Sequence, residues 1–246
     1  MVKRLVDVTL AAFGLLVAAP LLAAAAVGIR LSSPGPVLYR ARRAGRGGAP
    51  FLMYKLRTMH VDHGARQSTI TGSADPRVFP FGAWLRRTKV DELPQLVNVL
   101  RGEMAIVGPR PEDPTFVTAH YTVVQCETLA VAPGLASPGS LYSTTHGERW
   151  LSAAHPERDY LERLFPLKLA LDVVYVRGAS LPYDLTIILR TLHVLVAKVL
   201  GRSVFADPPE LAAAERLLAG LGPAVRPLSR LRPVERSITR SSRGLV

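Results

Sequence analysis

A chain of 246 residues is long enough for one main domain with a buried core and one or two additional segments. Its formal net charge of +12 points to an anionic partner, which can be a nucleic acid, a phospholipid surface or a phosphorylated substrate. Only 7% of the residues are aromatic, which disfavours a base-stacking platform, and the single cysteine, Cys126, excludes an intramolecular disulfide.

The N-terminal region contains a long apolar run, because no charged residue occurs between Asp7 and Arg30. A helix of this length can cross the hydrocarbon core of a membrane once, whereas a cleaved signal peptide usually has a shorter apolar core. Basic residues flank the run on both sides, so the positive-inside rule gives no clear direction of insertion. Pro20 removes a backbone hydrogen bond near the middle, which predicts a helix–break–helix that re-enters the same face of the membrane. A straight single span is the alternative.

The segment after the membrane region is predicted to form a β-hairpin. Residues 36–40 and 50–59 have the composition of strands, and the Gly-rich basic stretch 42–48 joins them. Alternation along the second strand places Lys55 and Arg57 on one face. These two cations are candidate phosphate ligands, although a solvated basic strand has the same pattern.

The centre of the sequence carries two adjacent acids, Asp91 and Glu92, after a short basic helix predicted at residues 83–88. Pro94 is tolerated only in the first turn of a helix, so the next helix is predicted to begin near Val90 or Asp91. The acids then lie at a helix N-terminus, where main-chain N–H groups favour carboxylates and also phosphate. An N-terminal cap on an ordinary core helix is the alternative interpretation. The buried face of this helix is predicted from the spacing of Leu93, Leu96, Val97 and Leu100.

A second polar motif follows one short strand later. Residues 104–107 are apolar and lead into Gly108-Pro109-Arg110-Pro111. The flanking prolines restrict the backbone around Arg110, and a guanidinium held in place is a natural bidentate ligand for phosphate. A purely structural turn is the alternative.

The C-terminal half is predicted to be mostly helical, with helices at residues 113–131, 156–176 and 185–200 and a loop at 132–140. Asp172 lies within the apolar stripe of the second helix, where an acid is either a ligand or a helix-surface residue. The third helix is apolar on nearly all sides but short for a membrane span. We expect it to lie in the membrane interface or to pack on the N-terminal segment.

The predicted organisation has three parts: a re-entrant membrane segment at residues 1–36, a compact domain at 37–203 and a basic tail at 204–246. After Asp207 the tail is predicted to contain one Ala/Leu helix and then a disordered stretch rich in Arg, Pro and Ser, which anionic lipids can hold. The expected fold class is α/β but mainly helical, with a short β-hairpin in the domain and amphipathic helices at the membrane surface.

Seven motifs occur in the order found in the bacterial sugar transferases, and the chain resembles this family over residues 2 to about 200. These proteins are monotopic phosphoglycosyl transferases that begin lipid-linked glycan and exopolysaccharide assembly. The motifs are Lys3-Arg4-Leu5-Val6-Asp7, the apolar segment broken by Pro20, Ser33-Pro34-Gly35-Pro36, Tyr54-Lys55-Leu56-Arg57-Thr58-Met59, Asp75-Pro76-Arg77, Asp91-Glu92-Leu93-Pro94-Gln95-Leu96 and Val107-Gly108-Pro109-Arg110-Pro111.

The resemblance implies that the domain at 37–203 is catalytic and transfers a sugar-1-phosphate from a UDP-sugar to polyprenol (undecaprenyl) phosphate, releasing UMP. It implies that Asp91 is the nucleophile of a covalent phosphosugar intermediate, that Glu92 orients or activates it, and that both acids hold Mg²⁺. It also implies work at the cytoplasmic face of the bacterial inner membrane, in contact with its lipids. The substrate-binding residues implied by the matching motifs are Lys55, Arg57, Arg110 and Asp172.

The chain departs from the family pattern at three places. Ala19 replaces the Ser that usually precedes the proline of the re-entrant helix, and residues 132–137 and 141–149 differ from the commoner loops. The identity of the sugar is therefore open, and so is the oligomeric state. Three other functions remain as alternatives: a metal-dependent glycosyltransferase without a covalent step, an inactive membrane scaffold of a glycan-assembly complex, and a nucleic-acid binder. The apolar N-terminal run and the scarce aromatic residues disfavour the last, so we expect no nucleic-acid partner.

Overall fold

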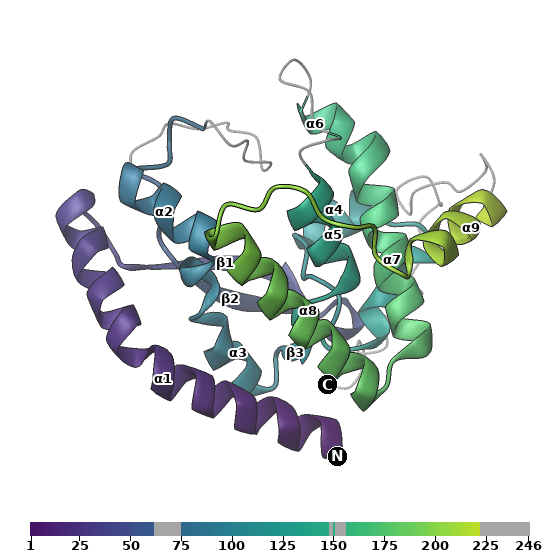
Figure 1. The fold of residues 1–246 in the computed structure, drawn as a ribbon, viewed down its shortest axis with the longest axis horizontal. Helices are drawn as coiled ribbons and strands as arrows, with labels where there is room; N and C mark the ends of the chain where they lie inside the picture. The colour runs from purple at the N-terminus through teal and green to yellow at the C-terminus, as the bar shows by residue number, and fades with distance from the viewer. Residues whose placement is uncertain (62–74, 148–149, 151–155, 222–246) are drawn as a thin grey trace, which may run out of the picture.

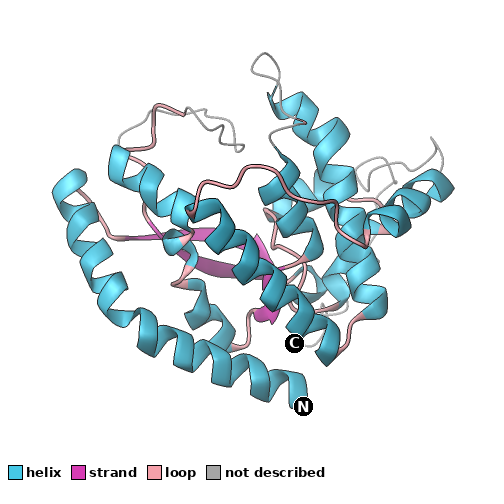
Figure 2. Cartoon of the chain, viewed as in Figure 1, coloured by secondary structure: helices cyan, strands magenta, loops and turns pink. Residues whose placement is uncertain are grey.

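The computed structural model describes residues 1–61, 75–147, 150 and 156–221. Most of these residues are helical, and a two-stranded β-hairpin lies near the centre of the molecule with helices around it (Figures 1 and 2). The predicted fold class is thus confirmed in its mainly helical character and its short hairpin.

Helix α1 (Val2–Ser32) forms one long side of the molecule and is continuous through Pro20 (Figure 1). The predicted helix–break–helix is therefore not found, because the chain stays helical where a break was expected and curves along the domain instead. A proline removes one main-chain donor, and helical bonds on either side can continue past it. Among the described residues, α1 is the one helix long and apolar enough to cross a membrane.

The inner face of α1 packs on the domain, and its outer face is apolar and exposed. Ala11 and Ile29 are fully buried in two hydrophobic clusters that join α1 to the hairpin and to the elements after it. The exposed apolar side chains include Phe13, Leu16, Val17, Leu21 and Val27. This distribution gives α1 a domain-facing side and an outward side suited to hydrocarbon.

Strands β1 (Leu38–Ala44) and β2 (Pro50–Leu56) pair antiparallel as predicted, and the 3-10 turn η1 (Arg46–Gly48) connects them. Ala41 and Met53 are partners in this register, and both are buried against α1 and the helix Gln95–Arg101. The opposite strand end brings Lys55 towards the elements that follow: α2 (Pro80–Thr88), η2 (Val90–Glu92) and α3 (Gln95–Arg101).

One helix was predicted over residues 113–131, but the structure has two pieces, α4 (Pro114–His120) and η3 (Gln125–Ala130). The interruption is a local capping arrangement. The main-chain N–H of Thr122 donates to Gln125 Oε1 at 2.9 Å, and the main-chain N–H of Gln125 donates to Thr122 Oγ1 at 3.3 Å. Such reciprocal bonds three residues apart start a new helical turn, so the single helix was a wrong prediction that missed this signal.

The remaining elements are helices packed on each other beside a small parallel pair of strands, β3 (Ala105–Val107) and β4 (Gly134–Ala136). The predicted long helix at 156–176 is found as α6 (Pro156–Asp159), a π-helical turn (Tyr160–Leu164) and α7 (Phe165–Gly178), with Pro166 just after the turn. The Ala/Leu helix expected after Asp207 is confirmed as α9 (Leu211–Leu221), and it packs on α7. The basic stretch 222–246 lies outside the described residues. The other helices are α5 (Pro138–His146) and α8 (Leu181–Val199).

Strands β3 and β4 approach so closely at Gly134 that no side chain fits there. A Cβ on Gly134 would lie 2.1 Å from the main-chain nitrogen of Gly108. We expect Gly134→Ala to lower the free energy of unfolding by about 3 kcal/mol, because the backbone must move apart. The matched control is Gly220→Ala in α9, where nothing lies within 4 Å and alanine should be neutral or stabilising. Denaturant unfolding in detergent measures both, and equal stabilities of the two variants would contradict this prediction.

Candidate active site

A cavity of about 870 Å³ opens beside the hairpin, α2 and the turn η2. Seven basic side chains and two acidic ones line it, so it is suited to a polyanion. Five of the six residues singled out by sequence as a candidate site line this cavity: Lys55, Arg57, Asp91, Glu92 and Arg110. The basic lining residues are Arg43, Lys55, Arg57, Arg77, Arg86, Lys89 and Arg110.

The two acids lie in a tight turn between two helices. Helix α2 ends at Lys89, whose left-handed conformation (φ 60°, ψ 14°) turns the chain into η2. Helix α3 begins at Gln95, with Pro94 as its N-cap. The helical turn therefore starts at Val90 as predicted, but the α-helix proper begins after the acids and not around them.

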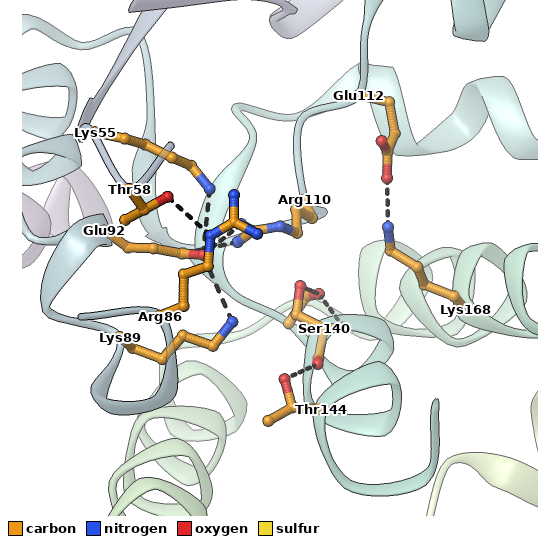
Figure 3. A network of polar contacts seen from close by, with 11 residues as sticks. Lys55, Thr58, Arg86, Lys89, Glu92, Arg110, Glu112, Ser140, Thr144 and Lys168 are labelled. Carbon is orange, nitrogen blue, oxygen red and sulfur yellow. Dashed lines mark hydrogen bonds and ion pairs between the residues drawn. The ribbon is translucent and has the colours of Figure 1, made fainter. Parts of the chain in front are cut away.

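Glu92 is the centre of the cationic network (Figure 3). Arg110 donates to it as a fork, with Nη1 2.9 Å from Oε2 and Nη2 2.6 Å from Oε1. The ammonium groups of Lys55 and Lys89 lie 3.3 Å and 3.6 Å from Oε1. Burial alone raises the pKa of a carboxyl, but Arg110, Lys55 and Lys89 outweigh it and hold the pKa of Glu92 well below its usual range. Glu92 is therefore ionised and its oxygens are occupied.

Asp91 differs from Glu92 in its hydrogen bonding and in the direction of its pKa shift. Its side chain is 6% exposed and lines the cavity, and its Oδ1 has no hydrogen-bond partner among the described residues. Burial, and then the negative charge of Glu92, raise the pKa of Asp91. A carboxylate with an unshared oxygen and a raised pKa is a better nucleophile than a fully solvated one.

Lys55 and Arg57 leave the same strand end but have different surroundings. Burial lowers the pKa of Lys55 to about 8, opposed by Glu92, so Lys55 stays largely protonated at neutral pH. Arg57 is 5% exposed, and its guanidinium donates to Pro36 O at 2.6 Å and to Ser33 O and Oγ at 2.7 Å and 2.8 Å. Arg57 thus ties the end of α1 to the hairpin, and its predicted contact with substrate remains a prediction.

Asp172 is not brought to the cavity. It is fully buried in α7, and its Oδ1 accepts a hydrogen bond of 2.9 Å from the main-chain N–H of Gly139, in the first turn of α5. It does not line the cavity, so the structure places it as a cap on α5 from another helix. Its predicted role in substrate binding gains no support from this position.

The burial of Asp172 has a consequence for stability. Burial raises the pKa of Asp172 to about 6 in the folded protein, from an ordinary value of 3.8. The folded state holds the proton more tightly, so this stabilising contribution is present below pH 3.8 and is lost as the pH rises through 6. Asp172→Asn cannot titrate, so we expect the variant to gain up to about 3 kcal/mol relative to wild type between pH 4 and pH 7. Urea unfolding of both proteins across this range tests it, and a constant difference would contradict the assignment.

Sequence reasoning did not assign four of the cavity cations to the site, namely Arg43, Arg77, Arg86 and Lys89, and the last two lie beside Glu92. Arg86 donates through Nε to Thr58 Oγ1 at 2.8 Å, and Figure 3 shows its guanidinium beside the side chains around Glu92. Arg86 belongs to the basic helix predicted at 83–88, and Lys89 directly follows it. Residues 86, 89 and 92 are three apart, so in a helical segment they share one side. This spacing could have predicted that Arg86 and Lys89 lie near Glu92.

Asp91 and Glu92 are the residues expected to hold Mg²⁺. The part of the chain that the structure describes has no group of three or more His, Cys, Asp or Glu side chains arranged for a metal. Mg²⁺ is often held by one or two carboxylates together with substrate phosphates. The unshared oxygen of Asp91 fits that kind of site, whereas both oxygens of Glu92 already accept from Arg110.

Comparisons with known proteins agree with the motif order. A sequence model of the family described as "Bacterial sugar transferase" matches residues 1–198. The chain is 47% identical over 133 residues to a putative undecaprenyl-phosphate N-acetylgalactosaminyl 1-phosphate transferase of Bacillus subtilis, covering 54% of this chain and 74% of that protein. It is 40% identical over 196 residues to a UDP-glucose:undecaprenyl-phosphate glucose-1-phosphate transferase of Caulobacter vibrioides (79% and 69%). The Escherichia coli protein of the same name is 35% identical over 194 residues, but only 39% of its length is matched.

Proposed function

Since the chain belongs to the bacterial sugar transferase family and is an enzyme of that class, we propose that it transfers a sugar-1-phosphate from a UDP-sugar to undecaprenyl phosphate and releases UMP. The observation that carries this proposal is the contrast between Asp91 and Glu92. Asp91 lines the cavity and has a buried oxygen without a hydrogen-bond partner among the described residues, whereas Glu92 is paired with Arg110, Lys55 and Lys89. Relatives that are named as glucose and N-acetylgalactosamine phosphotransferases support the substrate class.

In the first step, an oxygen of Asp91 attacks the phosphorus that carries the sugar. The new bond joins this oxygen to phosphorus, the phosphoanhydride bond breaks, and its electron pair leaves with UMP. Negative charge grows on the phosphoryl oxygens during this step, and fixed cations in a partly buried site stabilise it. We assign this role to Arg110 and Lys55, which both line the cavity.

In the second step, an oxygen of undecaprenyl phosphate attacks the same phosphorus. The bond to Asp91 breaks and the carboxylate is regenerated, which leaves the sugar joined to the lipid through a diphosphate. Splitting the transfer into two displacements lets one small site serve a soluble donor and a lipid acceptor in turn. When bound, Mg²⁺ neutralises phosphate charge, and Asp91 is the residue here that can hold it.

The attachment of α1 supports a site at the membrane surface. At the N-terminal end, Lys3 Nζ donates to Val107 O at 3.1 Å and Arg4 Nη1 donates to Val99 O at 2.5 Å. At the other end, Arg57 holds Ser33. Both ends of the apolar helix are therefore bonded to one domain, which favours entry and exit on the same face, the re-entrant arrangement, over a single span.

A second exposed apolar surface supports a location at the membrane. Helix α8 exposes a stripe at spacings of three and four residues, which is the pattern of a helix lying on an apolar phase. We assign this stripe and the outer face of α1 to the cytoplasmic leaflet of the inner membrane. The exposed residues of α8 are Leu185, Leu189, Leu192, Val196 and Val199.

The topology has a direct test in a Cys126→Ser background. Cysteines introduced by Val2→Cys in α1 and Arg42→Cys in the hairpin should both resist a membrane-impermeant maleimide in intact cells and react after permeabilisation. Labelling of the Val2→Cys variant from outside, with protection of the Arg42→Cys variant, would establish a single span and exclude the re-entrant arrangement.

The function is tested by a UMP-release screen. Purified protein with undecaprenyl phosphate and Mg²⁺ is supplied with a panel of UDP-sugars, and at least one should give UMP and a sugar-diphospho-lipid. Turnover without any covalent adduct on the protein would favour the non-covalent glycosyltransferase. No UMP with any UDP-sugar would favour the scaffold.

A further inference from the structure

Lys89 occupies a backbone conformation that lysine rarely adopts. Its φ of 60° is the one positive value among the non-glycine residues that the structure describes. A helix that ends in a left-handed residue usually has Gly or Asn there, because other side chains crowd the following carbonyl. A strained residue beside a functional site is a reason to ask what its side chain does.

The backbone turn itself does not need a lysine. The main-chain N–H of Lys89 donates to Arg86 O, and the Lys89 carbonyl accepts from Glu92 N–H at 3.1 Å. These bonds close α2 and open η2, and glycine would make all of them with less strain. The side chain must therefore account for the choice of residue.

The ion pair with Glu92 is also a weak explanation. Lys89 Nζ lies 3.6 Å from Glu92 Oε1, and the Lys89 side chain is 41% exposed. Glu92 already accepts a two-pronged pair from Arg110 and has Lys55 nearby. A third, partly solvated cation adds little to a carboxylate that is paired in this way.

The excess of positive charge along the cavity is suited to an anionic ligand. Basic side chains outnumber acidic ones by seven to two along the cavity wall, and Lys89 is one of them. Figure 3 shows its ammonium reaching towards Glu92 from the side opposite Lys55, so the two lysines flank the carboxylate. An anion with several charged oxygens, such as a diphosphate, can be gripped from both sides there.

We propose that Lys89 is a further substrate-binding residue, which donates to a phosphoryl oxygen of the nucleoside-diphosphate donor, and that its backbone strain is kept for this contact. The proposal rests on the proposed function, since it names a ligand group for the same site. The proposed contact lies away from the reacting atoms. Loss of the Lys89 ammonium should therefore weaken donor binding more than it slows the chemical steps.

Lys89→Gly and Lys89→Asn remove the charge and suit the left-handed backbone. For both variants we expect the KM for the UDP-sugar to rise about tenfold, with kcat changed less than about threefold. The melting temperature should be unchanged or higher, so a failure to fold does not obscure the result. Lys89→Arg should restore most of the affinity. The matched control is Arg87→Gln, an exposed cation on α2 that does not line the cavity and should leave KM unchanged.

Calorimetric titration with UDP provides a readout that does not depend on turnover. Wild type should bind UDP several-fold more tightly than Lys89→Gly and Lys89→Asn. Equal UDP affinities and equal KM values would overturn the proposal and leave Lys89 as a helix cap, as would a marked loss of stability in both variants. If wild type releases no UMP from any UDP-sugar, the proposed function fails, and the UDP titration still decides the role of Lys89.

Discussion

Asp91→Asn is expected to lower UMP release by about 10⁴-fold or more, because an amide oxygen cannot form the phosphosugar ester that the mechanism requires. The replacement keeps the size of the side chain. Burial and the charge of Glu92 both disfavour a charge at this position, so removing it should not destabilise the fold. Loss of activity with an intact melting curve is therefore the expected pattern.

The covalent step has its own measurement. Wild-type protein incubated with UDP-sugar and Mg²⁺, without lipid acceptor, should gain the mass of one phosphosugar, and the adduct should map to Asp91 by peptide mass spectrometry. Asp91→Asn should show no adduct.

The neighbouring acid supplies the control. Glu92→Gln should lose activity through disorder of the cations, yet Glu92 itself should never carry the adduct, because Arg110 occupies both of its oxygens. An adduct that maps to Glu92, or one that persists in Asp91→Asn, would reverse the roles assigned to the two acids.

The parts of the site that could be predicted are those that a short stretch of sequence encodes. The acids at 91 and 92, the basic strand end at Lys55 and the proline-flanked Arg110 are each local patterns, and the structure brings them together around one cavity. These side chains come together because of the hairpin register and the turn after α2. The order of the family motifs implies this arrangement, but the local residue patterns alone do not predict it.

The parts that could not be predicted depend on contacts distant in sequence. Arg57 has the same strand environment as Lys55, but its guanidinium finds Ser33 at the end of α1, so it holds two elements together. Asp172 looks like a site acid on a helix face, but the main-chain N–H of Gly139, in the first turn of α5, donates to it. Spacing along a helix does not reveal which element will pack against it.

The helix break predicted at Pro20 was wrong because a local rule was applied without regard to packing. A proline in a helix removes one hydrogen bond and predicts a break. Here α1 packs along its length on the domain, with Gly14 against Leu96 and Gly28 against Phe81. Burial of one face on both sides of the proline keeps the helix continuous, so the cost of one missing bond is absorbed as curvature.

Arg110 is expected to be the second most sensitive position, because it serves Glu92 and the substrate together. Arg110→Met leaves a buried carboxylate with only two lysines nearby, which should cost about 3 kcal/mol of folding free energy. Arg110→Lys keeps the charge but loses the fork, and should lower kcat/KM by about 10²-fold with a smaller effect on stability.

The double variant Glu92→Gln with Arg110→Met separates the two roles. Without the buried charge, the loss of the guanidinium no longer strands an ionised partner, so stability should return to within about 1 kcal/mol of the single variant Glu92→Gln. Activity should not return, because the cation that stabilises the phosphoryl oxygens is still missing. Thermal unfolding and UMP release on the four proteins of this cycle measure both effects. Recovery of activity along with stability would mean that Arg110 acts only by holding Glu92, and the phosphate contact assigned to it would then be wrong.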